Sequence, residues 1–85
     1  MCNEMQTQKQ DKFIEKMIKN LPVLRASIRI LQRELANKIG ITRQSMMAIE
    51  TRKRPLQWST YLALVLVFQQ REESKMLLES LCVFD

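Results

Sequence analysis

The amino-acid sequence predicts an all-α protein that forms one compact domain of five to six helices. Apolar residues recur at three- and four-residue intervals in successive segments of the chain, which is the helical period. Only residues 58–68 have a composition that a strand would also accept, and a strand with no second strand to pair with is unstable. The 85 residues suffice for one core, and no repeat or glycine-rich linker separates two domains.

The first part of the chain predicts two helices that precede the centre of the sequence. Residues 1–10 are polar and lack an apolar period, so we expect them to be flexible. From Asp11 on, one face of a predicted helix is apolar and the opposite face carries lysine and glutamate. Because Asn20 can cap a helix and Pro22 suits a first turn, we expect the chain to break there and to start a second helix.

The centre of the chain, QRELANKIGITRQSMMAIE over residues 32–50, predicts two short helices that meet at a tight corner. Gly40 can adopt the positive φ that lets the chain turn directly after the first of them. Ala36 is small where the two helices are expected to cross, and Thr42 is the expected N-cap of the second helix, from about Arg43 to Glu50. The side chains expected on the outer face of this second helix are Arg43, Gln44, Met47 and Ala48.

The last part of the chain predicts a basic loop and two further helices. Residues 51–55 have loop composition, because Pro55 disfavours helical angles at the preceding residue and the charges resist burial. Residues 58–68 are apolar on nearly every side, so a helix there is expected to be buried all round, with Trp58 and Tyr61 in the core rather than stacked on bases. After a polar hinge at residues 69–73, a short helix is expected to begin at Lys75 and to end near Leu81.

Positive charge is concentrated in and beside the central corner. The net charge is +5, and the segment from Arg25 to Arg54 holds eight basic and two acidic residues, a balance of +6 that leaves −1 for the rest of the chain. Such a distribution favours an anionic partner at this segment, as a surface that binds phosphates requires.

The residues also exclude several classes of function. There is no histidine, and Cys2 and Cys82 lack the spacing of a zinc or redox motif, so no metal or cofactor is expected. No paired carboxylates or phosphate-cradling glycine loop is found, so the protein is not expected to be an enzyme. The N-terminus lacks the apolar region of a signal peptide, and the longest apolar run, residues 61–68, is far shorter than the roughly 20 residues that span a bilayer. We expect a cytoplasmic protein that does not enter membranes.

The central string and the basic loop that follows it resemble the Cro and phage-repressor class of helix-turn-helix regulators, the XRE family. The resemblance runs from about Leu24 to Phe68, around half of the chain. It implies a lambda-repressor-like helix-turn-helix within a single domain, residues 11–85, and binding to double-stranded DNA, usually at a palindromic operator. The sequence departs from the family at Arg29 and Arg52, where glycine is usual, and at Leu31, where serine or threonine is usual.

The resemblance and the chemistry of the side chains together assign roles to individual residues. The residues expected to read base edges are Arg43, Gln44, Met47 and Ala48. The residues expected to contact phosphates are Gln32, Thr42, Ser45, Thr51, Arg52, Lys53 and Arg54. Some of these have a second interpretation: Arg43 and the basic loop as solvated surface, Gln44 as a hydrogen-bonding brace for Gln32, and Met47 as a surface residue instead of a contact to a thymine methyl.

Surplus apolar surface in the last two helices predicts a protein partner. A domain of this size cannot readily cover every face of residues 58–68 and of the final helix, and exposed apolar patches usually bind a partner. We expect a homodimer through the C-terminal helices, which would read two half-sites of an operator.

Two interpretations of the function follow from the sequence. The first is a sequence-specific transcriptional regulator of prokaryotic or phage origin, associated with the nucleoid and expected to act as a repressor. The alternative is a protein-interaction module, such as an antitoxin-like partner, whose DNA binding is secondary.

Overall fold

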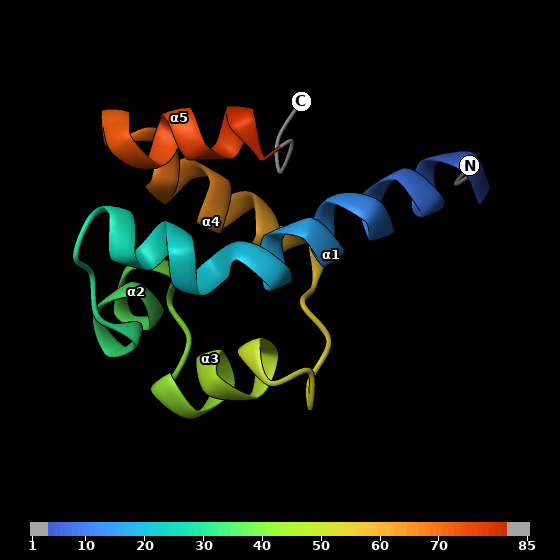
Figure 1. Ribbon diagram of the computed structural model, residues 1–85. Helices are drawn as coiled ribbons and strands as arrows, with labels where there is room; N and C mark the ends of the chain where they lie inside the picture. The colour runs from blue at the N-terminus through green and yellow to red at the C-terminus, as the bar shows by residue number, and fades with distance from the viewer. Residues whose placement is uncertain (1–3, 82–85) are drawn as a thin grey trace.

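Five helices and no strand make up residues 4–81, the part of the chain that the computed structural model describes, with side chains from Lys9 on (Figure 1). The helices are α1 (Glu4–Ser27), α2 (Gln32–Ile39), α3 (Arg43–Glu50), α4 (Trp58–Gln69) and α5 (Glu72–Ser80). The prediction of an all-α chain is confirmed, with the helix number at the lower end of the expected range. In Figure 1, α5 and α3 lie on opposite sides of α1 and α4, and the N-terminal part of α1 extends beyond the other helices.

Helix α1 is continuous, so the expected break at Asn20 and Pro22 is wrong. The helix also begins at Glu4 rather than at Asp11, which makes residues 4–10 helical; residues 1–3 of the segment expected to be flexible lie outside the described part of the chain, as do Cys2 and Cys82. The side chain of Asn20 caps nothing and instead donates a hydrogen bond to the carbonyl of Lys16, one turn earlier, at 2.8 Å.

Burial explains why α1 passes a proline without breaking. Met17, Leu21 and Leu24 are fully buried on one face of the helix, before and after Pro22, whose own side chain is exposed. A proline inside a helix costs about 3 kcal/mol, whereas burying a single large apolar side chain is worth about 1.5–3 kcal/mol. The common buried face therefore outweighs the local signal that proline provides.

The core forms where α4 meets the other helices. Helix α4 packs against α1, α2 and α5, and α1 also contacts α3 and α5. The ring of Tyr61 is buried, stacks on Trp58 with 4.6 Å between ring centroids, and lies 6.3 Å from the ring of Phe13 in α1. The placement of Trp58 and Tyr61 in and against the core, rather than on the surface, agrees with the sequence interpretation.

Helix α4 is not buried on every side, contrary to the sequence prediction. Leu62 and Leu66 are 46% and 62% exposed, although Tyr61, Leu64 and the other core residues of the helix are covered. Within residues 4–81, the other four helices cover one face of α4 and leave its other face exposed. The helix carries no charged residue, so the open face is neutral as well as apolar.

Helix α5 begins at Glu72, earlier than the expected Lys75, because the turn from α4 is fixed by a buried hydroxyl. The Ser74 Oγ donates a hydrogen bond to the carbonyl of Phe68 at 2.6 Å, which ties the start of α5 to the end of α4. Leu78 of α5 is fully buried within the single chain. The apolar surplus expected in the last helix is therefore smaller than the sequence indicated.

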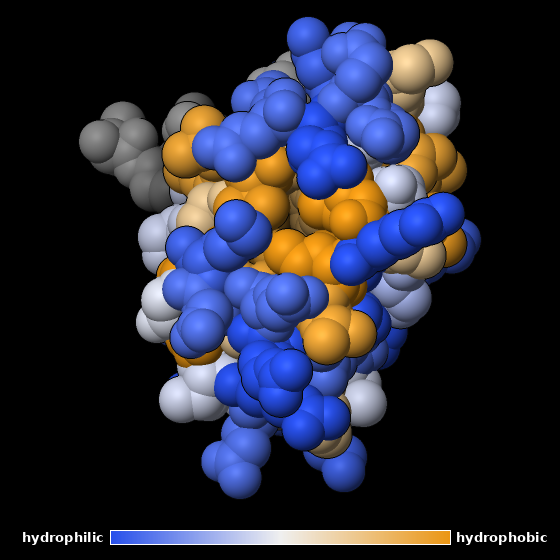
Figure 2. Space-filling view, turned by 90° about the vertical axis from the view of Figure 1, so that its left-hand side faces the viewer, coloured by the Kyte–Doolittle hydropathy of each residue, from blue (hydrophilic) through white to orange (hydrophobic). Residues whose placement is uncertain are grey.

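A second apolar surface lies at the turn between α1 and α2. Figure 2 looks onto this side of the molecule and shows an apolar strip between hydrophilic margins. A groove of about 270 Å³ lies here, and apolar Ile28, Ile30 and Val67 line it together with charged Arg29 and Lys38.

None of the helices within residues 4–81 is long and apolar enough to cross a membrane.

Replacing Pro22 with alanine is expected to raise the free energy of unfolding by about 1–3 kcal/mol. Alanine restores a backbone N–H that can donate inside α1, and removing the exposed proline ring loses no packing contact. Alanine also makes the unfolded chain more flexible, which offsets part of the increase in the free energy of unfolding. Urea denaturation of both proteins measures the difference. The matched control is Val23→Ala, an exposed neighbour in the same helix, which should change stability by less than about 0.5 kcal/mol. A lower stability of Pro22→Ala would contradict a continuous α1.

Candidate nucleic-acid interface

The corner between α2 and α3 has the geometry that the sequence predicts. Gly40 adopts a φ of 81°, and open space surrounds the position where a Cβ would stand, so its backbone conformation alone favours glycine. The amide of Ile41 donates to the carbonyl of Ala36 at 3.0 Å, which closes the end of α2. Ala36 is buried where the two helices meet. This corner fixes the direction in which α3 leaves.

Thr42 caps α3, as predicted. Its Oγ1 accepts a hydrogen bond from the backbone N–H of Ser45 and donates one to the Ser45 Oγ, both at 3.0 Å. The Ser45 Oγ also accepts a hydrogen bond of 2.6 Å from the Arg54 guanidinium. A groove of about 620 Å³ lies beside these three side chains, between the corner and the loop that leads to α4. Hydroxyls and a guanidinium along a groove are suitable donors for phosphate oxygens.

The two faces of α3 separate into core and surface. Met46 and Ile49 are buried, whereas Arg43, Gln44 and Met47 are exposed and Ala48 is partly exposed. The four residues predicted to read bases thus all reach the outer side of the helix. No hydrogen bond joins the side chains of Gln44 and Gln32 among the described residues, so Gln44 does not act as the brace that the sequence left open.

A cationic groove joins the starts of α2 and α3. It has a volume of about 360 Å³ and is lined by Arg25, Leu31, Gln32, Arg33 and Arg43. Gln32, a predicted phosphate contact, and Arg43, a predicted base contact, therefore lie on one continuous surface. Arg33 is a member of this surface that was not predicted, although its position directly after Gln32 in the basic segment indicates it.

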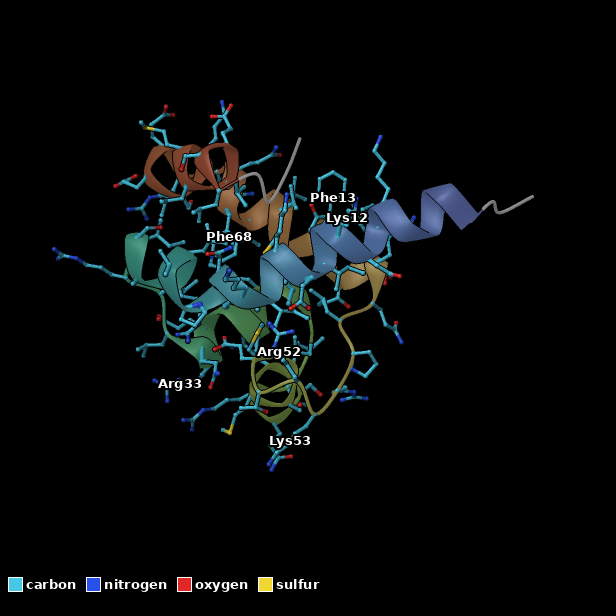
Figure 3. All side chains as sticks on the ribbon, turned by 45° about the vertical axis from the view of Figure 1, so that its right-hand side comes forward. Lys12, Phe13, Arg33, Arg52, Lys53 and Phe68 are labelled. Carbon is cyan, nitrogen blue, oxygen red and sulfur yellow. The ribbon has the colours of Figure 1, made fainter. Side chains whose placement is uncertain are left out.

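The residues of the loop after α3 point in different directions. The Thr51 Oγ1 donates to the carbonyl of Met47 at 2.9 Å, the Arg54 guanidinium bonds Ser45, and Arg52 reaches back to α1. Lys53 makes no ion pair or side-chain hydrogen bond with any residue between 9 and 81. Figure 3 shows Arg52 between α3 and α1, and Lys53 on the side of α3 that faces away from α1. Lys53 is thus the cation of this loop most available to a ligand.

Arg52 forms an ion pair with Glu15 of α1. The Arg52 Nη1 lies 2.5 Å from Oε1 and 2.7 Å from Oε2 of Glu15, with both side chains more than half exposed. Through this hydrogen bond Arg52 lowers the pKa of the Glu15 carboxyl below its ordinary value, and Glu15 raises the pKa of Arg52. This pair could not be predicted from the sequence, because its two residues are far apart in the chain.

A second ion pair, between Arg25 and Glu50, joins α1 to the last residue of α3. The Nε of Arg25 donates to Oε2 of Glu50 at 3.0 Å and the Nη2 donates to Oε1 at 3.1 Å. The two side chains are 20% and 10% exposed, so this is a bidentate pair largely shielded from water. This pair was not predicted from the sequence, where Arg25 and Glu50 enter only the charge balance of the central segment.

The three departures from the family pattern have direct structural consequences. Arg29 and Arg52 both adopt positive φ, 55° and 63°, where an L side chain costs about 1 kcal/mol or more relative to glycine. Leu31 has no side-chain oxygen or nitrogen that could accept a hydrogen bond and cap α2. Only one of the two hydrogen bonds of a capping box forms, from the Leu31 N–H to the Glu34 Oε1 at 2.9 Å. At Arg29 and Arg52 the backbone thus has the positive φ that glycine favours, and the two arginines are strained there.

Comparison with known proteins found no matching family model, curated protein or solved structure. The base and phosphate contacts therefore stay predictions, supported by the geometry and charge of this chain. Among residues 4–81 no group of three or more histidine, cysteine, aspartate or glutamate residues is placed to hold a metal ion.

Breaking the Arg25–Glu50 pair is expected to destabilise the fold by about 2–3 kcal/mol, because either single substitution, Arg25→Ala or Glu50→Ala, leaves a shielded charge unpaired. The double variant should lose less than the sum of the two, which a double-mutant cycle from urea denaturation measures. Arg33→Ala, an exposed arginine of the same surface, is the control and should cost less than about 0.5 kcal/mol. Additive losses would show that the two side chains do not interact.

Proposed function

We propose that the protein is a cytoplasmic, sequence-specific DNA-binding regulator that uses α2 and α3 as a helix-turn-helix and represses transcription by occupying an operator. The observation that carries the proposal is the outer face of α3, where Arg43 and Gln44 are exposed between two sources of positive charge. On one side lies the cationic groove at the starts of α2 and α3. On the other lies the basic loop of residues 51–54.

The dimensions of α3 suit the major groove. An α-helix with its side chains is about 10–12 Å in diameter, and the major groove of B-form DNA is about 12 Å wide. A short helix can lie there only if other elements hold it at a fixed angle, which the corner at Gly40 and the Arg25–Glu50 pair provide. Arg43 can then bond O6 and N7 of guanine, and Gln44 can bond N6 and N7 of adenine.

The remaining predicted residues fit contacts to the DNA backbone. Gln32 stands at the N-terminus of α2, where free backbone N–H groups favour an anion, and Arg33 follows it. Thr42 and Ser45 occupy the equivalent place on α3. Lys53 extends the positive surface past the end of α3. Contacts of this kind supply affinity that depends on salt but not on sequence.

The test is a selection of bound duplexes from genomic DNA, followed by titration of the selected duplex and a scrambled duplex with Arg43→Ala and Lys53→Ala. Arg43→Ala should lose about 1–3 kcal/mol of preference for the selected duplex, because it removes a base contact. Lys53→Ala should weaken binding to both duplexes alike and reduce the slope of log K against log salt by about one. The two variants are matched controls, since each removes one exposed positive charge.

Two results would contradict these assignments. An unchanged preference in Arg43→Ala would remove it from the base-reading residues. Equal effects of both variants on both duplexes would mean that the surface binds DNA by charge alone.

The open face of α4 supports the further proposal of a homodimer. Leu62 and Leu66 are spaced one turn apart on this face, and a helix without charges can meet a second copy of itself without repulsion. The excess positive charge lies between Arg25 and Arg54, so that segment disfavours contact with the same segment of a second copy. A dimer formed in this way would present two α3 helices to two half-sites of a palindromic operator.

Leu66→Gln is expected to shift the monomer–dimer equilibrium towards monomer by about tenfold or more, because it places an amide in the apolar contact between the two copies. Sedimentation equilibrium from 1 to 100 μM measures the dissociation constant. Val23→Gln is the control, since Val23 is exposed to a similar degree on α1 and should leave the equilibrium unchanged. A wild-type protein that stays monomeric across this range would contradict the dimer.

The apolar strip in Figure 2 favours the protein-interaction module as the second candidate function. The groove at the α1–α2 turn combines apolar Ile28 and Val67 with cationic Arg29 and Lys38, on a side of α2 separate from the α3 corner. A partner protein that copurifies with the chain and is lost on Val67→Gln would support this alternative, whereas sequence-specific binding of the isolated protein to DNA would support the first proposal.

A further inference from the structure

Of the three basic residues in the loop after α3, Arg52 is the one with a carboxylate partner among residues 9–81. Its Nη1 lies within 2.7 Å of both Glu15 oxygens, so the guanidinium is turned towards α1 and away from solvent on the α3 side. The backbone of this loop is fixed independently of that pair. The amide of Arg52 donates to the carbonyl of Ile49 at 3.1 Å, and the amide of Lys53 donates to the carbonyl of Ala48 at 2.8 Å.

We propose that Glu15 is an intramolecular competitor of DNA phosphate for Arg52, and that it limits the affinity of the interface for DNA. The inference depends on the proposed DNA-binding function and names one element that regulates that same surface. A carboxylate and a phosphate offer a guanidinium the same kind of oxygen pair, so one Arg52 side chain binds one or the other.

Exposure makes this competition reversible. The side chains of Arg52 and Glu15 are 51% and 57% exposed, and ion pairs at such positions are weak and screened by salt. A phosphate can therefore displace Glu15 at a modest cost. The Glu15 carboxyl is ionised near neutral pH even at the ordinary pKa of a glutamate, and the hydrogen bond from Arg52 lowers its pKa further.

Electrostatic repulsion also opposes the binding of Arg52 to DNA, in addition to the loss of its ion pair with Glu15. When Arg52 leaves Glu15 to contact DNA, an unpaired carboxylate remains beside a polyanion, and like charges repel. The protein thus gains less from Arg52 than from Lys53, which has no carboxylate partner among residues 9–81 to release. Removing the negative charge of Glu15 should make Arg52 a full phosphate contact.

The variant that tests this is Glu15→Gln, compared with Glu73→Gln. Both substitutions remove one exposed negative charge, but Glu73 belongs to α5, on the opposite side of the molecule from α3. Fluorescence anisotropy with the selected and scrambled duplexes, over a series of salt concentrations, gives the affinity and its salt slope. Relative to Glu73→Gln, we expect Glu15→Gln to bind both duplexes roughly two- to five-fold more tightly and to steepen the salt slope by about one.

The background Arg52→Gln identifies the residue through which Glu15 acts. In that background, adding Glu15→Gln should raise affinity less than it does in the wild-type protein, because no Arg52 guanidinium is left to release and only the repulsion between Glu15 and DNA is removed. A gain of undiminished size in that background would overturn the inference, and so would equal affinities of Glu15→Gln and Glu73→Gln on duplexes that both bind. If wild type, Glu15→Gln and Glu73→Gln all fail to bind either duplex, the proposed DNA-binding function is overturned and this inference with it.

Discussion

The position of α3 depends on the ion pair between Arg25 and Glu50. A helix of eight residues is too short to be stable alone, and a glutamate at its last position opposes the helix dipole. No basic residue in the last turn of α3 offsets that charge. Arg25 supplies the missing cation from α1, with two hydrogen bonds in a site mostly shielded from water. The pair therefore removes an unfavourable charge and fixes the C-terminal end of the helix whose outer face is proposed to read DNA.

The opposite end of α3 is fixed by local geometry, so the helix is held at two points by different means. Gly40 turns the chain and Thr42 caps the first turn, both within a few residues of α3. The loop that follows is held by backbone hydrogen bonds to the end of α3, but it lacks a glycine, and Arg52 takes a positive φ that glycine would adopt without strain. Its side chain instead extends to Glu15, so α1 contacts the loop after α3 as well as the end of the helix.

The difference between local features and contacts of residues distant in sequence explains which parts of the structure the sequence could predict. The corner and α3 are marked by Gly40 and Thr42, whose effects act over one turn of helix. The break expected at Pro22 was wrong because buried residues on both sides of it outweigh a local preference, and burial depends on the whole fold. The Arg25–Glu50 and Glu15–Arg52 pairs join residues distant in sequence, and no spacing in a single sequence indicates such contacts. The open face of α4 was missed for a related reason: composition shows that a helix is apolar, but not how many neighbours cover it.

The outer surface of α3 and the open face of α4 differ in charge, so they favour different partners. The surface of α3 and the adjoining grooves is cationic, so it favours a polyanion and disfavours a second copy of the same protein. The open face of α4 has no charge and exposes leucines, so it gains from an apolar contact and offers nothing to a phosphate. Two copies repel each other where their cationic segments, Arg25 to Arg54, approach, and a contact between the neutral faces of α4 avoids that repulsion. Self-association through α4 would therefore leave both α3 surfaces free, and the doubled positive charge of the pair would strengthen its attraction to DNA.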